Sequence, residues 1–292
     1  MDFWSSSTFQ PRLLQGSFAV RFGNDFYRRF GDLQYDRTIR CVEFLQMTNF
    51  GKVAIVTGGS RGIGAAIAAR LAQDGFNIVL NHSSSNSADA DAVARSIQAI
   101  GMDAHICRGD VADPGCAKDM FDLAETQLGG VDAVVINAGV MLLSRIADMD
   151  DDAFDREVAV NLKGAFNFMR EASKRLREGG SVVSISTSAI ATRRETYGAY
   201  AATKAAVELL SQVMAKEMRG RRISVNAVAP GPTSTDLLLQ GLSADVLEQL
   251  AKSSPYERLG TPEDIAATVA FLCSPSGAWV NGQVIRVNGG TI

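Results

Sequence analysis

Thr57-Gly-Gly-Ser-Arg-Gly-Ile-Gly64 follows a β-branched run, Val53–Thr57, and opens an alanine-rich run with helical spacing, Ile63–Asp74. Glycine clusters occur in many turns, so the cluster alone is weak evidence. Its place between a strand and a helix is the context that a phosphate-binding turn requires, because the N-terminus of the helix offers N–H donors and the positive end of its dipole. The segment therefore predicts the first unit of a dinucleotide-binding fold.

The glycines of this turn have separate tasks. Gly58 permits the tight turn, Gly62 lets the backbone approach a pyrophosphate, and Gly64 lets the helix pack closely on the strand. The spacing is Gly-x-x-x-Gly-x-Gly and not Gly-x-Gly-x-x-Gly. We expect cofactor contacts from six residues of the turn: Gly58, Ser60, Arg61, Gly62, Ile63 and Gly64.

The rest of the chain continues the alternation. The runs typical of strands are Val53–Thr57, Asn77–Leu80, Ala104–Cys107, Ala133–Ile136, Ser181–Ser186, Ile223–Val228 and Val284–Val287. The stretches with helical spacing are Ile63–Asp74, Ala90–Ile100, Phe154–Leu176, Tyr200–Met218 and Pro262–Leu272. Strands that alternate with helices indicate βαβ units and right-handed crossovers. We expect an α/β fold, a single doubly wound Rossmann-type domain over residues 47–292, with a seven-stranded parallel sheet and helices on both faces.

Residues 1–46 differ in composition from the rest. They hold ten of the 21 aromatic residues, one alanine and no lysine. A transit peptide would be poor in acidic residues, but this segment contains several. A signal peptide would have an apolar stretch after a basic start, and this segment has no such stretch. We expect an N-terminal extension outside the fold, with a partner-binding or targeting arm as the alternative.

Bulk composition excludes several classes of protein. The formal net charge is -3, so no basic surface for nucleic acid is implied. Two histidines and four cysteines without metal-like spacing predict no metal site and reduced thiols in a cytoplasmic protein. No apolar run approaches the roughly 20 residues of a membrane helix.

The end of the second strand indicates which dinucleotide binds. An acid there would bind the ribose 2′-hydroxyl of NAD, but no acid occurs before Asp89. Arg61 and the hydroxyl of Ser83 suit a 2′-phosphate better. We therefore favour NADP(H), keep NAD(H) as possible, and place Asn81, His82 and Ser83 at this end of the cofactor. The alternative is that Arg61 is a solvated charge and the serines only mark a turn.

Two further strand ends carry candidate contacts. Asp110-Val111 follows the third strand, where Asp110 either accepts from the adenine amino group or caps the helix that starts near Pro114. Asn137-Ala138-Gly139 ends the fourth strand. Its small residues let the backbone pass close to the cofactor ribose, although an ordinary strand-to-loop turn would look the same.

Tyr200-Ala-Ala-Thr-Lys204 begins a helix, and its spacing of four puts both side chains on one face. A free tyrosine titrates near about pH 10, so it is a poor acid or base at neutral pH. A nearby ammonium group favours the phenolate; a shift of about three pKa units would need roughly 4 kcal/mol. After the fifth strand of a dinucleotide-binding sheet, this pair is a candidate for proton transfer.

The chain from Lys52 to Ile292 resembles the short-chain dehydrogenase/reductase family, in its single-domain branch near 3-oxoacyl-acyl carrier protein reductases. The resemblance rests on seven motifs that occur in the same order as in the family. The matching segments are Thr57–Gly64, Asp110-Val111, Asn137–Gly139, Asn161–Gly164, Tyr200–Lys204, Pro230-Gly231 and Thr235. The resemblance implies that Tyr200 exchanges a proton with the substrate oxygen while a hydride moves to or from the nicotinamide. It implies that Lys204 lowers the pKa of Tyr200 and holds the ribose, and that Asn161 holds a water.

The resemblance also places Pro230, Gly231 and Thr235 at the nicotinamide end. The position of the family's substrate-orienting serine is Thr187, whose hydroxyl can also donate to a carbonyl; Ser186 or Ser188 are the alternatives.

The expected function is therefore that of an NADP(H)-dependent oxidoreductase that interconverts a small-molecule ketone and a secondary alcohol. The alternatives are an NAD-dependent alcohol dehydrogenase of the same family and a non-catalytic dinucleotide-binding protein.

Apolar residues outside these motifs suggest a pocket and an assembly. Leu237–Leu239, Leu242, Val246, Leu247 and Leu250 form either a lid over the cofactor or an amphipathic helix packed on the body. Met141–Leu143 and Tyr197 are expected to add pocket wall. The two longest helices have more apolar surface than one sheet face can cover, so we expect a homodimer or homotetramer, with Trp279–Val287 as a second contact.

Overall fold

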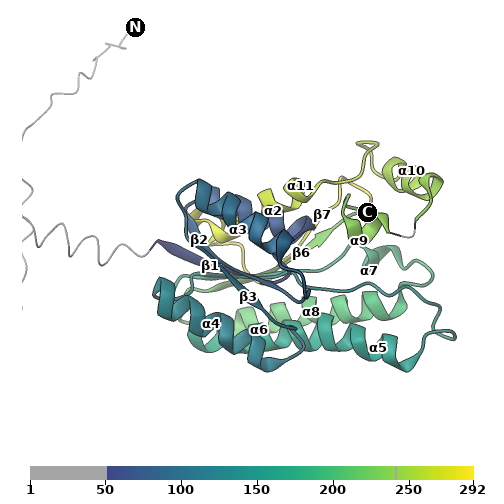
Figure 1. Cartoon of the computed structure of the whole chain (residues 1–292). Helices are drawn as coiled ribbons and strands as arrows, with labels where there is room; N and C mark the ends of the chain where they lie inside the picture. The colour runs from purple at the N-terminus through teal and green to yellow at the C-terminus, as the bar shows by residue number, and fades with distance from the viewer. Residues whose placement is uncertain (1–50, 241) are drawn as a thin grey trace, which may run out of the picture. The chain divides into compact units, whose positions relative to one another are not determined.

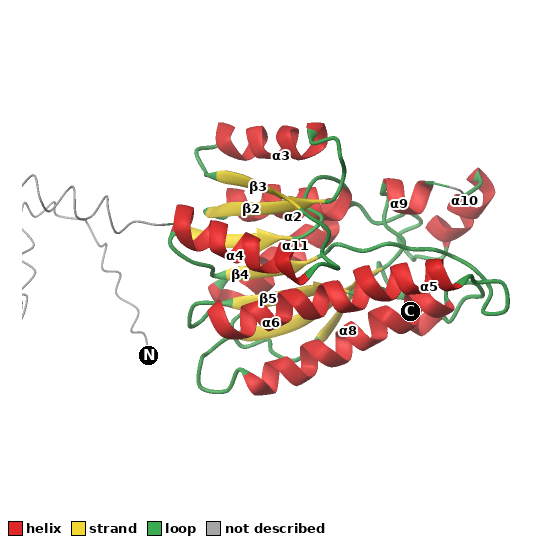
Figure 2. Ribbon diagram, turned by 60° about the horizontal axis from the view of Figure 1, so that its bottom comes forward, coloured by secondary structure: helices red, strands yellow, loops and turns green. Residues whose placement is uncertain are grey.

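The computed structural model describes residues 51–240 and 242–292, so the proposed extension over residues 1–46 lies outside the described residues. Seven parallel strands form one sheet in the order β3-β2-β1-β4-β5-β6-β7. Their bounds are β1 Lys52–Val56, β2 Phe76–His82, β3 Ala104–Arg108, β4 Ala133–Ile136, β5 Ser181–Ile185, β6 Ser224–Pro230 and β7 Val284–Val287. Figure 2 shows the strands side by side with helices around them.

Helices cover both faces of the sheet, which confirms the predicted doubly wound architecture (Figure 1). One face carries α2 (Gly62–Gln73), α3 (Ala88–Ala99) and α11 (Pro262–Cys273). The other face carries α4 (Pro114–Leu128), α6 (Ala165–Arg175) and α8 (Gly198–Glu217). The central strands β1 and β4 are buried between two helical layers, and apart from Lys52 their residues are apolar on both sides.

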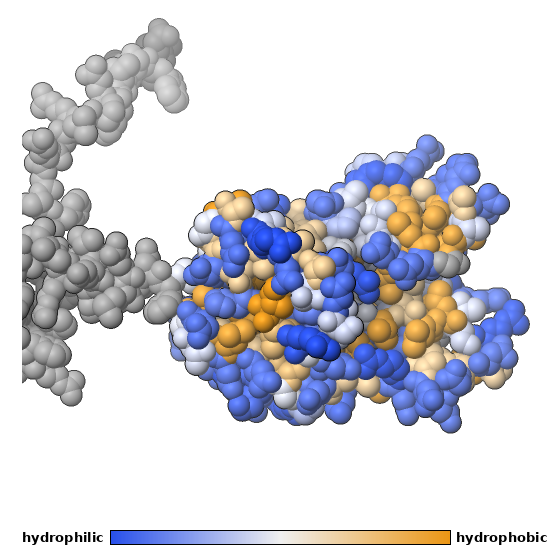
Figure 3. Space-filling view, in the orientation of Figure 1, coloured by the Kyte–Doolittle hydropathy of each residue, from blue (hydrophilic) through white to orange (hydrophobic). Residues whose placement is uncertain are grey.

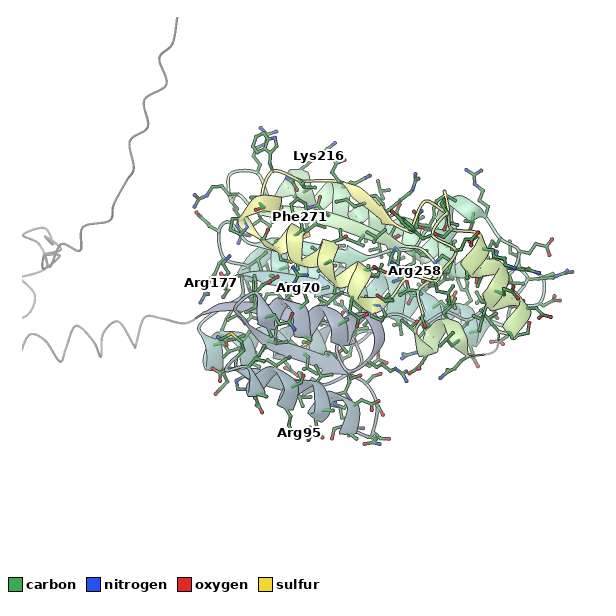
Figure 4. The ribbon with its side chains drawn as sticks, turned by 90° about the horizontal axis from the view of Figure 1, so that it is seen from above. Arg70, Arg95, Arg177, Lys216, Arg258 and Phe271 are labelled. Carbon is green, nitrogen blue, oxygen red and sulfur yellow. The ribbon has the colours of Figure 1, made fainter. Side chains whose placement is uncertain are left out.

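Helices α2 and α11 pack against each other on the first face, although nearly 200 residues separate them in sequence. Small side chains such as Ala68 and Ala266 are buried where the two helices meet the sheet. Figure 4 looks onto this face, with Arg70 on α2 and Phe271 on α11. The outer side of α11 leaves Phe271 43% exposed, so this helix has apolar surface that the described chain does not cover.

The helix expected over Phe154–Leu176 is divided in the structure. It consists of α5 (Asp151–Glu157), a π-helical segment η1 (Val158–Gly164) and α6. Apolar spacing does not distinguish α from π turns, so the sequence pattern predicts one uninterrupted helix. Side-chain bonds from Asn161 to the neighbouring loop and helix lie at the middle of the π segment, and π turns of this kind often mark functional positions.

Most other boundaries move by one or two residues. The largest extension is at β2, which continues through Asn81 and His82 because these residues pair with Cys107 and Arg108 of β3. Their polar side chains gave the sequence the appearance of a strand end. Cys107, Cys116 and Cys273 are free cysteines, as expected.

After β6 the chain leaves the sheet and forms α9 (Asp236–Leu239) and α10 (Ala244–Lys252) before α11. Figure 3 shows apolar surface gathered over these two helices. The short helix α7 (Ala189–Thr192) follows β5 on the same side of the molecule. Within the described residues there is no helix long and apolar enough to cross a membrane and no cluster of potential metal ligands.

Candidate active site

The glycine turn joins β1 to α2 at the carboxyl edge of the sheet, where β1 pairs with both β2 and β4. Gly58 has φ +61° and Gly62 has φ +53°, a region that favours glycine. A Cβ on Gly64 would collide with the carbonyl oxygen of Gly58, so the helix approaches the turn as closely as the motif predicts. The first N–H groups of α2 therefore face the crevice at this switch point.

Two asparagines brace this turn from the neighbouring strands. Asn137 donates from Nδ2 to the carbonyls of Thr57 at 2.9 Å and Gly58 at 3.1 Å. Asn81 accepts from the N–H of Gly58 at 3.3 Å and donates to the carbonyl of Gly109 at 2.9 Å. Both had been assigned to the cofactor from their positions; the structure gives their side chains the task of holding the turn.

The candidates for the 2′-phosphate lie together around the turn and the end of β2. Arg61 is the N-cap residue of α2, and its exposed side chain makes no ion pair within residues 51–240 and 242–292. Ser83 is exposed. His82 is 4% exposed, and its Nδ1 has no hydrogen-bond partner in the described chain. Arg61 and Ser83 thus remain available to a ligand.

Asp110 does not cap the following helix, because Asp113 is the N-cap residue of α4 and accepts from the N–H of Gly115. Asp110 accepts from the N–H of Ala112 at 3.0 Å and from Arg156 at 2.6 Å. Partial burial opposes ionisation, but these two bonds lower the pKa of Asp110. The residue is therefore a carboxylate acceptor at the edge of the site. Val111, beside it, is buried against Gly164.

Tyr200 and Lys204 lie one turn apart in the first half of α8, and both line a cavity of about 470 Å³. The Lys204 side chain is only 5% exposed, and its Nζ donates to the carbonyl of Ile185 at 2.9 Å. This bond fixes the ammonium group at the end of β5. The proton-transfer pair inferred from the sequence therefore faces the carboxyl edge of the sheet.

The three hydroxyl-bearing candidates, Ser186, Thr187 and Ser188, all line the same cavity as Tyr200. Ser186 donates to Glu208 at 2.6 Å, and Ser188 donates to the carbonyl of Ala229 at 3.1 Å. The hydroxyl groups of both serines are thus engaged within the fold. Thr187 therefore stays the prediction for the substrate-orienting residue, because its hydroxyl is still free to donate a hydrogen bond.

The pKa of Tyr200 differs from expectation. Burial raises it to about 12, and the Thr187 hydrogen bond opposes this shift. The predicted effect of Lys204 on Tyr200 stays a prediction. Burial also lowers the pKa of Lys204 to about 8, although the charge of Glu157 opposes that shift. Burial penalises the charged form of each group.

Asn161 holds the loop that follows β4. Its Oδ1 accepts from the N–H of Val140 at 2.8 Å, and its Nδ2 donates to the carbonyl of the same residue at 2.9 Å. A Cβ on Gly139 would lie 3.2 Å from both Asn161 Oδ1 and Lys204 Nζ. The absence of a side chain at Gly139 therefore leaves room beside these two polar atoms.

Glu157 is a site residue that the sequence analysis missed. Its side chain is fully buried, and Oε1 accepts from the N–H of Leu142 at 2.7 Å. The charge of Glu157 acts on both Lys204 and Tyr200. No motif marked it, because a glutamate in a helix is usually exposed.

The cavity joins the glycine turn to the tyrosine. Its walls include Ile63 of α2, Asn137 and Gly139 after β4, and the expected nicotinamide-end residues Pro230, Gly231 and Thr235. The methyl group of Thr235 lies 3.4 Å from the position of a Cβ on Gly62. These residues lie at the carboxyl edge of the sheet, where α/β folds of this kind bind dinucleotides.

The substrate end of the cavity is mainly apolar. The residues expected as pocket wall divide: Met141 and Tyr197 line the cavity, whereas Leu142 and Leu143 are 39% and 37% exposed and do not. The lid candidates also divide, since only Leu237, Leu238 and Leu250 line the cavity. Leu250 is also the buried residue of α10, so the lid and the packed helix both stay open as interpretations of this segment.

A family model described as enoyl-(acyl carrier protein) reductase matches residues 58–291. A protein of Picea abies named short-chain type dehydrogenase/reductase is 46% identical over 252 residues, which cover 83% of this chain and 93% of that one. An Arabidopsis thaliana protein named NADPH-dependent aldehyde reductase 2, chloroplastic, is 40% identical over 83% of this chain and 94% of its own length.

The structural neighbours agree with these relatives. The crystal structure of a short-chain dehydrogenase from Burkholderia cenocepacia in complex with NADP has a TM-score of 0.77 and 37% sequence identity. The alignment covers 82% of this chain and 97% of that one.

Proposed function

This chain belongs to the short-chain dehydrogenase/reductase family, enzymes that act on CH–OH or C=O groups with NAD(P), and we propose that it reduces aldehydes or ketones with NADPH by tyrosine acid catalysis. The observation that carries the proposal is the arrangement of Thr187, Tyr200 and Lys204 around one cavity at the carboxyl edge of the sheet.

The cofactor is NADP(H). Arg61 and Ser83 are exposed beside the glycine turn, and no acid follows β2 before Asp89, so a 2′-phosphate finds a positive partner and no repulsion. The relative of Arabidopsis thaliana is named NADPH-dependent, and the structure from Burkholderia cenocepacia contains NADP. When bound, NADPH supplies the hydride.

The chain's own residues manage the proton. Thr187 donates a hydrogen bond to the carbonyl oxygen of the substrate, and Tyr200 gives its phenolic proton to the alkoxide that develops there. Lys204 lies one helical turn away and stabilises the phenolate left behind. Asn161 binds the loop at Val140 and borders the space beside Lys204. A proton that returns to Tyr200 after the reaction passes through this space.

The cavity favours a substrate with an apolar group next to the carbonyl. Met141, Tyr197, Leu237 and Leu250 surround that end, and burial of apolar surface would supply the binding energy. Arg194 also lines the cavity, so the far end can accept a polar or anionic substituent.

The test is NADPH oxidation, followed by absorbance, with a panel of aliphatic and aromatic aldehydes and ketones. We expect turnover of at least one apolar carbonyl compound, and turnover at least about 100-fold slower with the Tyr200→Phe variant. Fluorescence titration with NADPH accompanies it. Tight NADPH binding without turnover of any member of a broad panel would favour a non-catalytic dinucleotide-binding protein.

The proposal also includes a location in the cytoplasm. Imaging of a tagged full-length chain would check it.

A further inference from the structure

Glu157 is a buried carboxyl group that the proposed chemistry does not yet use. It is the last residue of α5, and its side chain is 0% exposed. One carboxyl oxygen, Oε1, accepts from the N–H of Leu142, but Oε2 has no hydrogen-bond partner among the described residues. An unpartnered buried polar oxygen is costly, so a nearby opposite charge is its natural compensation.

The position of Glu157 connects it to the reacting groups. Asn161, four residues later in the same helical segment, binds Val140 as Glu157 binds Leu142. The two side chains thus hold alternate residues of one loop, and that loop begins at Gly139. The site of a Cβ on Gly139 is 3.2 Å from Lys204 Nζ.

The charged groups around Glu157 single out one partner. From α8, Lys204 and Tyr200 both feel its charge, with Tyr197 beside Tyr200. The loop from Gly139 to Leu143 has no titratable side chain.

On the α5 helix itself, Asp155 and Arg156 are exposed, and Arg156 pairs with Asp110 instead. Among the described residues, Lys204 is the one cation whose charge lowers the pKa of Glu157, and it acts from α8, which packs against α5, without a direct ion pair.

We propose that Glu157 is a positioning residue whose carboxylate serves as the buried counter-ion of the Lys204 ammonium group and keeps the proton on Lys204 during turnover. The inference rests on the proposed function and deepens it. The hydrogen bond from Lys204 goes to a neutral carbonyl, that of Ile185, which cannot offset the loss of water around a full positive charge. Glu157 supplies the missing negative charge from the α5 side.

The titration behaviour of the pair agrees with this geometry. Burial lowers the pKa of Lys204 to about 8, and Glu157 opposes the shift. Burial raises the pKa of Glu157, and the Leu142 bond and the charge of Lys204 oppose that shift in turn. Each group therefore favours the charged form of the other. Without Glu157, the pKa of Lys204 should fall further.

The direct test measures the proton on Lys204 without relying on turnover. Trace acetic anhydride acetylates only the neutral amine, and peptide mass spectrometry reads each lysine separately as a function of pH. We expect Glu157→Gln to move the acetylation curve of Lys204 to lower pH by about one unit or more. Lys216, on the far end of α8, is the internal reference and should not move. Asp155→Asn, an exposed carboxylate on the same helix, is the matched control.

Rescue and kinetics complete the design. Glu157→Asp keeps the charge and should leave the Lys204 curve closer to wild type than Glu157→Gln does. In the NADPH-dependent reduction, the alkaline fall of kcat should move to lower pH in Glu157→Gln by the same amount as the acetylation curve. Glu157→Met, which preserves buried volume and removes the charge, replaces the glutamine variant if that variant does not fold.

The outcomes separate the two proposals. A folded Glu157→Gln variant whose Lys204 curve coincides with wild type would overturn the counter-ion role, whatever the activity. An aspartate variant shifted as far as the glutamine variant would overturn it as well. If wild type shows no turnover but the Lys204 curve moves as expected, the proposed reductase activity fails while the pairing of Glu157 with Lys204 stands.

Discussion

The Nζ of Lys204 donates to the main-chain carbonyl of Ile185 at 2.9 Å, and this bond ties the first half of α8 to the end of β5. The same two elements bring Thr187 and Tyr200 together, because Thr187 follows β5 and Tyr200 lies one turn before Lys204. The geometry of proton transfer therefore depends on how one helix docks on one strand end. The following predictions start from that arrangement.

The role of Tyr200 predicts a separation of binding from chemistry. Tyr200→Phe keeps the ring in the cavity wall but removes the proton donor, so NADPH affinity should stay within about twofold while kcat falls at least about 100-fold. Fluorescence titration and steady-state kinetics measure the two quantities. A fall of less than about tenfold, equivalent to about 1.4 kcal/mol of barrier, would contradict acid catalysis by Tyr200.

The role of Thr187 predicts a dependence on its hydroxyl and not on its methyl group. Thr187→Val should lower kcat/KM for a carbonyl substrate by about 10- to 100-fold, the loss expected for one hydrogen bond to a developing charge. Thr187→Ser should remain near wild type. Ser186→Ala is the control, because its hydroxyl is bonded to Glu208 and its loss should affect stability more than kcat/KM. Equal losses in Thr187→Val and Thr187→Ser would count against the assignment.

The exposed cation in the glycine turn predicts cofactor preference. Arg61→Ala combined with Ser83→Asp should shift the ratio of kcat/KM values from NADPH towards NADH by about 100-fold or more, because the 2′-phosphate loses a charge-assisted bond and gains a repulsive neighbour. Arg70→Ala is the matched control on the same helix, since Arg70 pairs with Asp74 and lies away from the turn (Figure 4). A wild type more active with NADH at equal concentration would overturn the preference itself.

The buried ammonium group predicts an unusual pH dependence of stability. The pKa of Lys204 is lowered from 10.5 to about 8 on folding, so between these values the unfolded chain binds more protons and the free energy of unfolding should rise with pH. Below about pH 8 the burial of this charge costs up to roughly 3 kcal/mol.

Lys204→Met should be inactive, and its stability at pH 7 should reflect two opposed changes, because the cost of the buried ammonium group disappears while Glu157 loses its counter-ion. It should also lack this rise in stability between pH 8 and 10. Urea denaturation at a series of pH values measures both effects. Parallel pH profiles for the two proteins would show that Lys204 is not the group responsible.

The apolar surface of α5, α6 and α8 predicts assembly. Phe154, Phe166, Leu209 and Val213 are exposed, whereas Met169 and Met214 from the same expected faces are buried in the core. We expect a homodimer or homotetramer that uses the exposed set and the 98% exposed Trp279.

A chain that starts at Met47 should keep both the assembly and kcat/KM, as measured by size-exclusion chromatography with light scattering and by kinetics. Leu209→Lys should yield a smaller species. If the chain from Met47 onward is monomeric or inactive, residues 1–46 are needed for assembly or activity.

The sequence by itself determined the order of strands and helices and the residues of the nucleotide turn. Those features are local: β-branched runs, alanine-rich runs and glycines at fixed spacing act within a few residues of one another. The resemblance carried by these motifs also placed Tyr200 and Lys204, and the parallel sheet with helices on both faces followed from the alternation.

Tertiary structure decided the features that depend on contacts between segments far apart in the sequence. Ser186 and Ser188 donate to Glu208 and Ala229, so these distant residues decide that the Thr187 hydroxyl is the one left free to donate. The π segment around Asn161 depends on Val140 and Thr203, contacts that no helical pattern encodes.

Glu157 reaches the site only because α5 packs against α8 and the loop after β4. Its burial, and with it the pKa values of Tyr200 and Lys204, depends on the loss of water around the site. Dehydration belongs to the packed molecule and not to any stretch of sequence.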